Sequence, residues 1–179
     1  MQPHLQLAKE LWKNFLKKGD LAIDATCGNG NDTLFLCELC TVIGIDIQET
    51  DIESTEKLLA LHDKKAALHR LSHEKIDELP LPHPPHLIVY NLGYLPKGSK
   101  KITTMVETTL LSVKKSLEIL APQGALSITC YPGHEEGKLE EKVLEEWAAA
   151  LPSNKWLVCH HKWPNRKEAP SLLWISSIT

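Results

Sequence analysis

The chain has 179 residues, and its 20 lysines and arginines against 23 aspartates and glutamates give a net charge of -3. This length fits about one domain with its own hydrophobic core, so we expect a single domain over residues 1–179. A hydrophobic content of 42% with 24% charged residues excludes disordered, collagen-like and coiled-coil proteins. The charge also excludes a protein that coats nucleic acid through bulk positive charge, so a nucleic-acid partner would need a local basic patch.

The sequence indicates a cytoplasmic protein that does not contact membranes. No apolar run approaches the roughly 18 residues of a membrane helix, and residues 1–15 are amphipathic, unlike a signal peptide. The cysteine count of 5 is odd, and the cysteines lie mostly in apolar segments, which favours reduced thiols. Cys37 and Cys40 have CxxC spacing, but no second pair follows. Two small hydrophobic side chains on one helix are therefore favoured over a zinc or redox site, and we expect no metal.

Hydrophobic periodicity predicts strands and helices that alternate along most of the chain. In chain order the predicted elements are a helix (5–16), a strand (21–24), a helix (32–40), a strand (41–46), a helix (52–62), a strand (66–71), a helical turn (75–79), a strand (86–91), a helix (103–120), a strand (125–131), a helix (135–151) and two strands (156–162 and 171–177). Alternation of this kind predicts an α/β fold, a doubly wound and mostly parallel sheet of seven strands. Because no helix separates the last two strands, they should form an antiparallel hairpin at one edge.

Polar residues follow five of the predicted strands. In a doubly wound sheet, ligands bind outside the carboxyl ends of the strands, so these residues should meet at one edge. The five groups are residues 24–33, 46–48, 72–73, 91–96 and 131–134.

The strongest of these groups is the segment Asp24-Ala25-Thr26-Cys27-Gly28-Asn29-Gly30. Its glycines permit a tight turn and the close approach of a ligand to the backbone. Asp46 lies 22 positions after Asp24 at the end of the next strand, where a carboxylate can accept hydrogen bonds from both hydroxyls of a ribose. The alternative is that Asp24 and Asp46 only cap helices or turns.

Two nucleotide cofactors fit this outline unequally. A nicotinamide dinucleotide would need GxGxxG with its pyrophosphate at the helix N-terminus, but Thr33 stands at the third glycine position. Asp24 and Asp32 would also repel a pyrophosphate. S-adenosylmethionine is cationic and free of phosphate, so it tolerates these carboxylates and presents a ribose to Asp46.

The motifs together resemble one bacterial family of Rossmann-like methyltransferases. The first motif, DATCGNG, is similar to the acidic residue and GxGxG-like turn of such enzymes, except that Thr26 stands where many members have glycine. The family was long labelled rRNA methylase, and its characterised members methylate 5-aminomethyl-2-thiouridine at the tRNA wobble position. The resemblance covers nearly the whole chain. The matching segments are residues 24–36, 46–49, 72–73, 91–96, 102–104 and 131–138.

The resemblance implies a homodimer that uses S-adenosylmethionine and assigns residues to its parts. Asn29 and Asn31 would reach the methionine end, Asp46 and Gln48 the ribose, and Ser72 and His73 the adenine. The remaining expected cofactor residues are Asp24, Thr26, Gly28, Gly30, Asp32, Asn91 and Gly93.

The segment Asn91-Leu92-Gly93-Tyr94 is similar to the (D/N)PP(Y/F) motif of amino methyltransferases, although both prolines are missing. There an Asn carbonyl and a backbone carbonyl accept hydrogen bonds from the target amine, so positioning carries much of a direct methyl displacement. The amine must first lose its proton, and His134 or His73 would accept it. Alternatively, His134 is a turn residue hydrogen-bonded to backbone. Tyr94 either stacks on the target base or packs under its loop.

Basic residues near the same edge are candidates for contacts with the anticodon arm of tRNA. They are Lys97, Lys100 and Lys101, together with Asn165, Arg166 and Lys167. Alternatively, these lysines form an ordinary solvated run with no RNA contact. If RNA does bind here, the acidic helix predicted over 135–146 would have to face away from it. Cys159, His160 and His161 alternate along a strand, so a joint metal site is not expected.

Three other functions remain open at this point. One is methylation of rRNA or of a small amine, and another is a nicotinamide enzyme. The third is a non-catalytic nucleotide-binding module that interacts with RNA. The intact set of Gly28, Gly30 and Asp46 argues against this last class.

Overall fold

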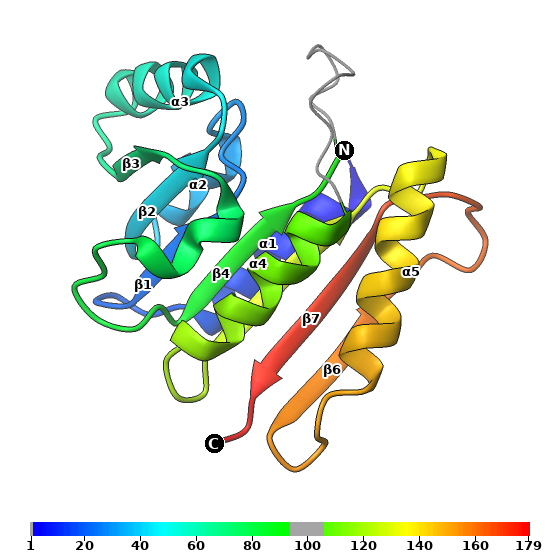
Figure 1. Cartoon of the computed structure of the whole chain (residues 1–179). Coiled ribbons are helices and arrows are strands. Elements are labelled where there is room, and N and C mark those ends of the chain that lie inside the picture. The colour runs from blue at the N-terminus through cyan, green and yellow to red at the C-terminus, as the bar shows by residue number, and fades with distance from the viewer. Residues whose placement is uncertain (1, 94–105) are drawn as a thin grey trace.

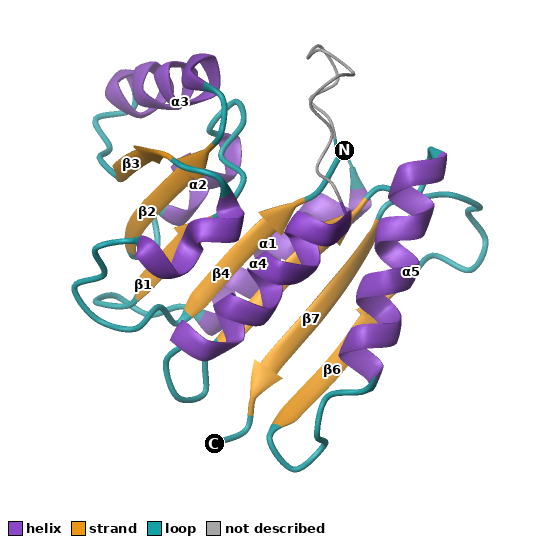
Figure 2. Cartoon of the chain, in the orientation of Figure 1, coloured by secondary structure: helices purple, strands orange, loops and turns teal. Residues whose placement is uncertain are grey.

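The computed structural model describes residues 2–93 and 106–179, which build a seven-stranded sheet with helices on both faces (Figures 1 and 2). The strands are β1 (Leu21–Asp24), β2 (Thr41–Asp46), β3 (Ala67–Arg70), β4 (Leu87–Asn91), β5 (Ala125–Cys130), β6 (Trp156–His161) and β7 (Ser171–Ser177). Their order in the sheet is β3-β2-β1-β4-β5-β7-β6. The chain therefore builds one half of the sheet outward from β1 and then returns to β4 beside it.

The sheet is parallel except at β7. This strand pairs antiparallel with both β5 and β6, while the other neighbouring strands run parallel. The predicted α/β sheet and its antiparallel C-terminal hairpin are confirmed. Since β1 and β4 are adjacent strands from which the chain continues in opposite directions, the cleft above their carboxyl ends is the topological switch point where such folds bind ligands.

Helices cover both faces of the sheet. They are α1 (Pro3–Phe15), α2 (Asn31–Leu36), α3 (Glu49–Leu61), the 3-10 helix η1 (His73–Glu78), α4 (Val106–Ile119) and α5 (Glu135–Ala149). Helices α1 and α2 lie behind the sheet in Figure 2, whereas η1, α4 and α5 lie in front of it. Helix α3 packs against α2, the edge strand β3 and its neighbour β2. Among the described residues, no helix has the length and apolar character required to cross a membrane.

The side chains of the strands pack into two separate hydrophobic cores, one on each face of the sheet. On the face of α1, the buried Trp12 donates its indole N–H to Ser127 Oγ on β5 at 2.8 Å. On the opposite face, the Tyr90 hydroxyl lies 2.5 Å from Ser112 Oγ and 2.7 Å from Ser116 Oγ on α4. These buried polar contacts fix both layers against the sheet, because a buried hydroxyl or indole without a partner would be costly.

Two predicted helix boundaries are wrong. Helix α2 ends at Leu36, so Cys37 and Cys40 do not share a helix as expected. The chain tightens there through bonds from Glu38 N to Phe35 O and from Leu39 N to Leu36 O, which turn it into β2. Helix α3 begins at Glu49, earlier than predicted. The first turn is polar, so the hydrophobic pattern did not indicate this start, although acidic residues there favour a helix N-terminus. Residues 103–105 of the fourth predicted helix lie outside the described residues.

A carboxyl group buried between α4 and α5 should make stability depend on pH. Glu140 is 4% exposed and accepts a 2.6 Å hydrogen bond from Thr109 Oγ1. Burial raises the pKa of Glu140 to about 7, against the lowering effect of the Thr109 bond, and the charge of Glu136 adds to the rise. The stability that this group contributes is therefore present below its unfolded pKa and is lost as pH rises through about 7.

We accordingly expect Glu140→Gln to be more stable than the wild type at pH 8 and nearly equal to it at pH 4.5. The glutamine carbonyl still accepts from Thr109 but carries no charge to desolvate. A gain of about 1–2 kcal/mol would raise the melting temperature by about 3–6 °C. Thermal unfolding at both pH values measures it, with the exposed Glu118→Gln as the matched control. An equal change at both pH values would contradict the assignment.

Candidate cofactor and catalytic site

The loop between β1 and α2 depends on its glycines. Gly28 and Gly30 have φ values of 51° and 79°, in the left-handed region that favours glycine. A Cβ at Gly30 would lie 2.8 Å from Thr55 Cα, so α3 packs directly against the loop. Thr55 also donates its hydroxyl to Gly28 O at 3.2 Å. The loop backbone is thus held in place from α3, a contact that the sequence did not indicate.

Asp46 connects this loop to the end of β2. One carboxylate oxygen accepts from Gly28 N at 3.0 Å, and the other accepts from Gln48 N at 3.0 Å. Each oxygen can accept a further bond, so the group retains capacity for two hydroxyls. Gln48, two residues after Asp46, donates its side-chain amide to Asp51 at 2.9 Å, and this bond orients the Gln48 side chain. Asp46 therefore does cap a turn, and each of its oxygens can still accept a hydrogen bond from a ligand.

Asp24 is a buried carboxyl at the end of β1. It is 1% exposed and accepts from Thr33 Oγ1 at 2.6 Å and Thr26 N at 3.2 Å. Burial raises the pKa of Asp24 to about 7, and the charges of Asp32 and Asp46 raise it further, while the bonds from Thr33 and Thr26 lower it. A cation that approached these three carboxylates would favour the ionised form, whereas a pyrophosphate would be repelled.

Asn91, at the end of β4, is held from β1 and α2. Its backbone N–H donates to Thr26 Oγ1 at 2.7 Å, and its side-chain amide donates to Asp32 at 3.0 Å. Lys9 on α1 pairs with the same Asp32 at 3.6 Å. Thr26 thus has a use that a glycine could not supply, which accounts for the departure from the usual motif. Since the NH2 end of the Asn91 side chain is bound to Asp32, its carbonyl oxygen is the end that can accept a bond from a substrate.

Tyr131 belonged to the strand-end group 131–134 but was given no role of its own, and it packs against Asn91 and Gly93. A Cβ at Gly93, where φ is 130°, would lie 3.3 Å from the Tyr131 ring. Burial raises the pKa of Tyr131 to about 12, and Asp32 adds to this, while a hydrogen bond with the Asn91 side chain lowers it. The phenol stays protonated at neutral pH and can donate a hydrogen bond. Its position directly after β5 indicated that Tyr131 lies at the ligand-binding edge of the sheet.

Ser72 and His73 reach the same edge beside β2. Leu71 N donates to Asp46 O at 2.9 Å, which brings the end of β3 next to Asp46. The His73 ring lies edge-on to Tyr90, with 6.0 Å between ring centres. Burial lowers the pKa of His73, against the raising effect of Glu74 and Asp46, so its ring is neutral at pH 7. Asn29 and Asn31 are exposed on the loop and at the start of α2.

Other predicted residues lie elsewhere. His134 is the N-cap of α5, and its Nδ1 accepts from Gly137 N at 3.1 Å, which is the structural role left open for it. Asn165 and Arg166 are exposed in the loop between β6 and β7. Tyr94, Lys97, Lys100 and Lys101 lie outside the described residues.

The Cys159-His160-His161 stretch alternates as expected. Cys159 is exposed, while His160 turns toward α5, where its Nε2 lies 2.9 Å from Ser171 Oγ and its Nδ1 lies 3.3 Å from Glu145. Within residues 2–93 and 106–179, no group of three or more potential ligands is arranged to hold a metal ion.

A mixed sheet of this order, with a glycine loop and strand-end acids at its switch point, defines the class of Rossmann-like S-adenosylmethionine-dependent methyltransferases. A structure from Clostridium thermocellum, described as a putative rRNA-methylase, matches with a TM-score of 0.93 and 33% identity over 98% of this chain and 97% of that one. A methyltransferase described as putative, from Streptococcus mutans and in complex with SAH, matches with a TM-score of 0.90 and 31% identity over 99% of both chains.

The family follows from sequence as well. The model of the family described as "Putative rRNA methylase" matches residues 42–177. A chloroplastic tRNA (mnm(5)s(2)U34)-methyltransferase of Arabidopsis thaliana is 38% identical over 95% of this chain and 68% of its own length. The chain belongs to this family and is a methyltransferase that uses S-adenosylmethionine.

Proposed function

We propose that the enzyme methylates the aminomethyl group of 5-aminomethyl-2-thiouridine at the tRNA wobble position. The observation that carries this proposal is Asn91, an amide fixed by Thr26 and Asp32 at the switch point and bordered by the Tyr131 phenol. An amide carbonyl held in this way suits an amine N–H. The activity for which the Arabidopsis relative is named supplies the nucleoside.

Different residues would bind the cofactor and orient the acceptor amine. S-adenosylmethionine supplies an electrophilic methyl group when bound. Asp46 would hold its ribose, the carboxylates of Asp24 and Asp32 favour its positive charge, and Ser72 and His73 would border its adenine. Asn91 would accept a hydrogen bond from the acceptor amine and so direct the nitrogen lone pair, which makes orientation the main catalytic contribution. We assign the role of proton acceptor to His73, since burial lowers the pKa of His73 and keeps its ring neutral.

The proposal also requires a basic surface that binds the RNA around the methylated nucleotide. A net charge of -3 requires a confined basic surface, and we assign it to Lys97, Lys100 and Lys101 after the Asn91 segment, together with Arg166 in the loop between β6 and β7. A homodimer would let a second subunit add positive surface. The anticodon arm is the expected footprint.

The test is to incubate the protein with labelled S-adenosylmethionine and total tRNA, digest the RNA and identify the labelled nucleoside by mass spectrometry. Ribosomal RNA serves as the competing substrate, because the family description names rRNA. We expect label in 5-methylaminomethyl-2-thiouridine and none in tRNA that lacks the aminomethyl group. Label confined to rRNA would replace the tRNA assignment.

The affinity for S-adenosylmethionine should rise with pH because of Asp24. Since its pKa is raised to about 7, much of the carboxyl is protonated at pH 6, and binding a cation beside it must release that proton. We expect affinity to increase by about 3- to 10-fold from pH 6 to pH 8 in the wild type. Calorimetry measures the affinity against pH for the wild type and for Asp24→Asn. The amino group of the cofactor titrates in both proteins, so the difference between the two pH profiles belongs to Asp24. Parallel profiles would contradict the prediction.

A further inference from the structure

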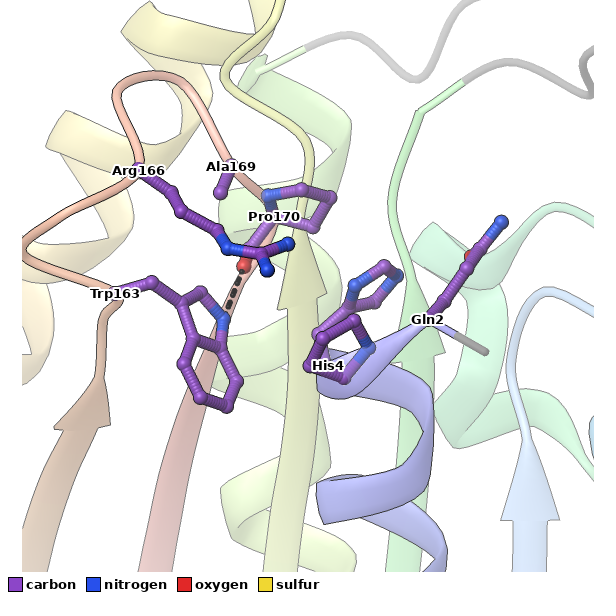
Figure 3. A pocket seen from close by; sticks show the side chains of 7 residues that line it. Gln2, His4, Trp163, Arg166, Ala169 and Pro170 are labelled. Atoms are coloured by element: carbon purple, nitrogen blue, oxygen red, sulfur yellow. Dashed lines mark hydrogen bonds between the residues drawn. The ribbon is translucent and has the colours of Figure 1, made fainter.

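A cavity of about 340 Å³ lies between the start of α1 and the loop that joins β6 to β7 (Figure 3). We call it the N-terminal cavity, and its lining includes Pro3, His4, Trp163, Arg166 and Pro170. Its volume lies in the range of small-molecule sites, about 300–1,000 Å³. The cofactor site at the ends of β1, β2 and β4 does not include any of these residues.

Two flat rings line the cavity, and both are held in place. Trp163 donates its indole N–H to Pro170 O at 3.1 Å, which fixes the ring to its own loop (Figure 3). His4 lies edge-on to Tyr131, with 5.5 Å between ring centres, and its Nε2 lies 3.4 Å from the Tyr131 hydroxyl. Burial lowers the pKa of His4, against the raising effect of Asp32, so its ring is neutral at pH 7. The partly exposed Trp163 ring suits stacking on a nucleobase, whereas His4, which is 5% exposed, forms part of the cavity wall.

The same cavity favours an anion. The exposed Arg166 reaches over it, and among the described residues its guanidinium has no acidic partner, because Glu168 in the same loop is paired with Lys138 at 2.8 Å. Helix α1 begins here with Pro3 and has no acidic residue in its first turn and no side-chain cap. The positive end of its dipole is therefore not neutralised by its own residues. A cation and a helix N-terminus beside two rings match a phosphate attached to a base.

We propose that the N-terminal cavity binds one nucleotide of the RNA substrate, next to the nucleotide that is methylated. Its base would stack on Trp163, with His4 in the wall of the cavity, and its phosphate would lie near Arg166. The inference rests on the proposed RNA methylation and adds a second contact point for that substrate.

The flanking position follows from Tyr131. This side chain contacts Asn91 on one side and His4 on the other, so its ring and that of His4 separate the cavity from the switch point. A base in the cavity cannot present its own substituent at Asn91. Neighbouring nucleotides of one strand can occupy the two places, and the cavity would then help to set the register of the RNA.

The test measures binding of a fluorescent anticodon stem-loop RNA by anisotropy, independently of methyl transfer. We expect Arg166→Gln and Trp163→Leu to weaken binding about 5- to 20-fold each, with S-adenosylmethionine affinity unchanged. Arg166→Gln should also reduce the slope of log affinity against log salt by about one, whereas Trp163→Leu should not. Trp163→Phe retains a ring and should stay within about twofold of the wild type. Lys155→Gln, which removes an exposed charge just before β6, at the other end of this strand from the β6–β7 loop, is the matched control.

The outcomes separate this inference from the proposed function. Stem-loop binding that depends on Arg166 and Trp163 supports the cavity even if no methyl group is transferred. Wild-type affinity in both variants would overturn the inference even if tRNA is methylated, as would an equal loss in Lys155→Gln. Tighter binding of free UMP than of the stem-loop, measured by quenching that disappears in Trp163→Phe, would assign the cavity to a free nucleotide instead.

Discussion

Asp46→Asn is expected to lower the affinity for S-adenosylmethionine at least 100-fold while the protein remains folded. The carboxylate already accepts from Gly28 N and Gln48 N at 3.0 Å each, and we assign its remaining lone pairs to the hydroxyls of the ribose. An asparagine offers one acceptor oxygen and turns its NH2 toward one of two backbone N–H groups. Losing two charge-assisted bonds of about 1.5–3 kcal/mol each accounts for this magnitude.

Calorimetric titration measures this affinity, and circular dichroism confirms the fold. Glu49→Gln is the matched control, because it removes one negative charge close to Asp46, from an exposed pair with Arg70 at 2.6 Å, without touching the glycine loop. We expect the control to stay within about threefold of the wild type. If Asp46→Asn binds as tightly as the control, Asp46 does not hold the ribose.

Asn91→Ala is expected to reduce kcat at least 100-fold with little change in S-adenosylmethionine affinity. The substitution retains the backbone bond to Thr26 at 2.7 Å, so the end of β4 should stay in place. It removes the carbonyl that we assign to the acceptor amine, and misplacement of an attacking group is costly because orientation carries much of such a reaction. Steady-state kinetics with saturating cofactor and RNA measures kcat.

Asp32→Asn tests whether this effect belongs to Asn91 itself. It keeps an oxygen that can accept the 3.0 Å bond from the Asn91 side chain but removes the charge and the pair with Lys9. We expect a loss of less than about tenfold. A kcat for Asn91→Ala within threefold of the wild type would show that the amine is positioned by another group.

Much of the cofactor site could be predicted because its residues follow strands directly. Asp24, Asp46, Ser72 and Asn91 each come after a short apolar run, and the rule that parallel strands end at one edge brings them together. Gly28 and Gly30 could be identified because a tight turn after a strand requires residues that tolerate positive φ. The start of α3 could not be predicted, because its first turn is polar and carries no hydrophobic period.

The sequence by itself determined the alternation of strands and helices, the doubly wound sheet and the acids and glycines at its switch point. Only the tertiary structure decided which neighbours complete the site. Thr26 meets Asn91 across 65 positions, and His4 meets Tyr131 across 127. The N-terminal cavity likewise joins the two ends of the chain. Periodicity and spacing report on residues within one element or its adjoining turn, whereas these contacts depend on which strands are neighbours and how α1 packs behind them.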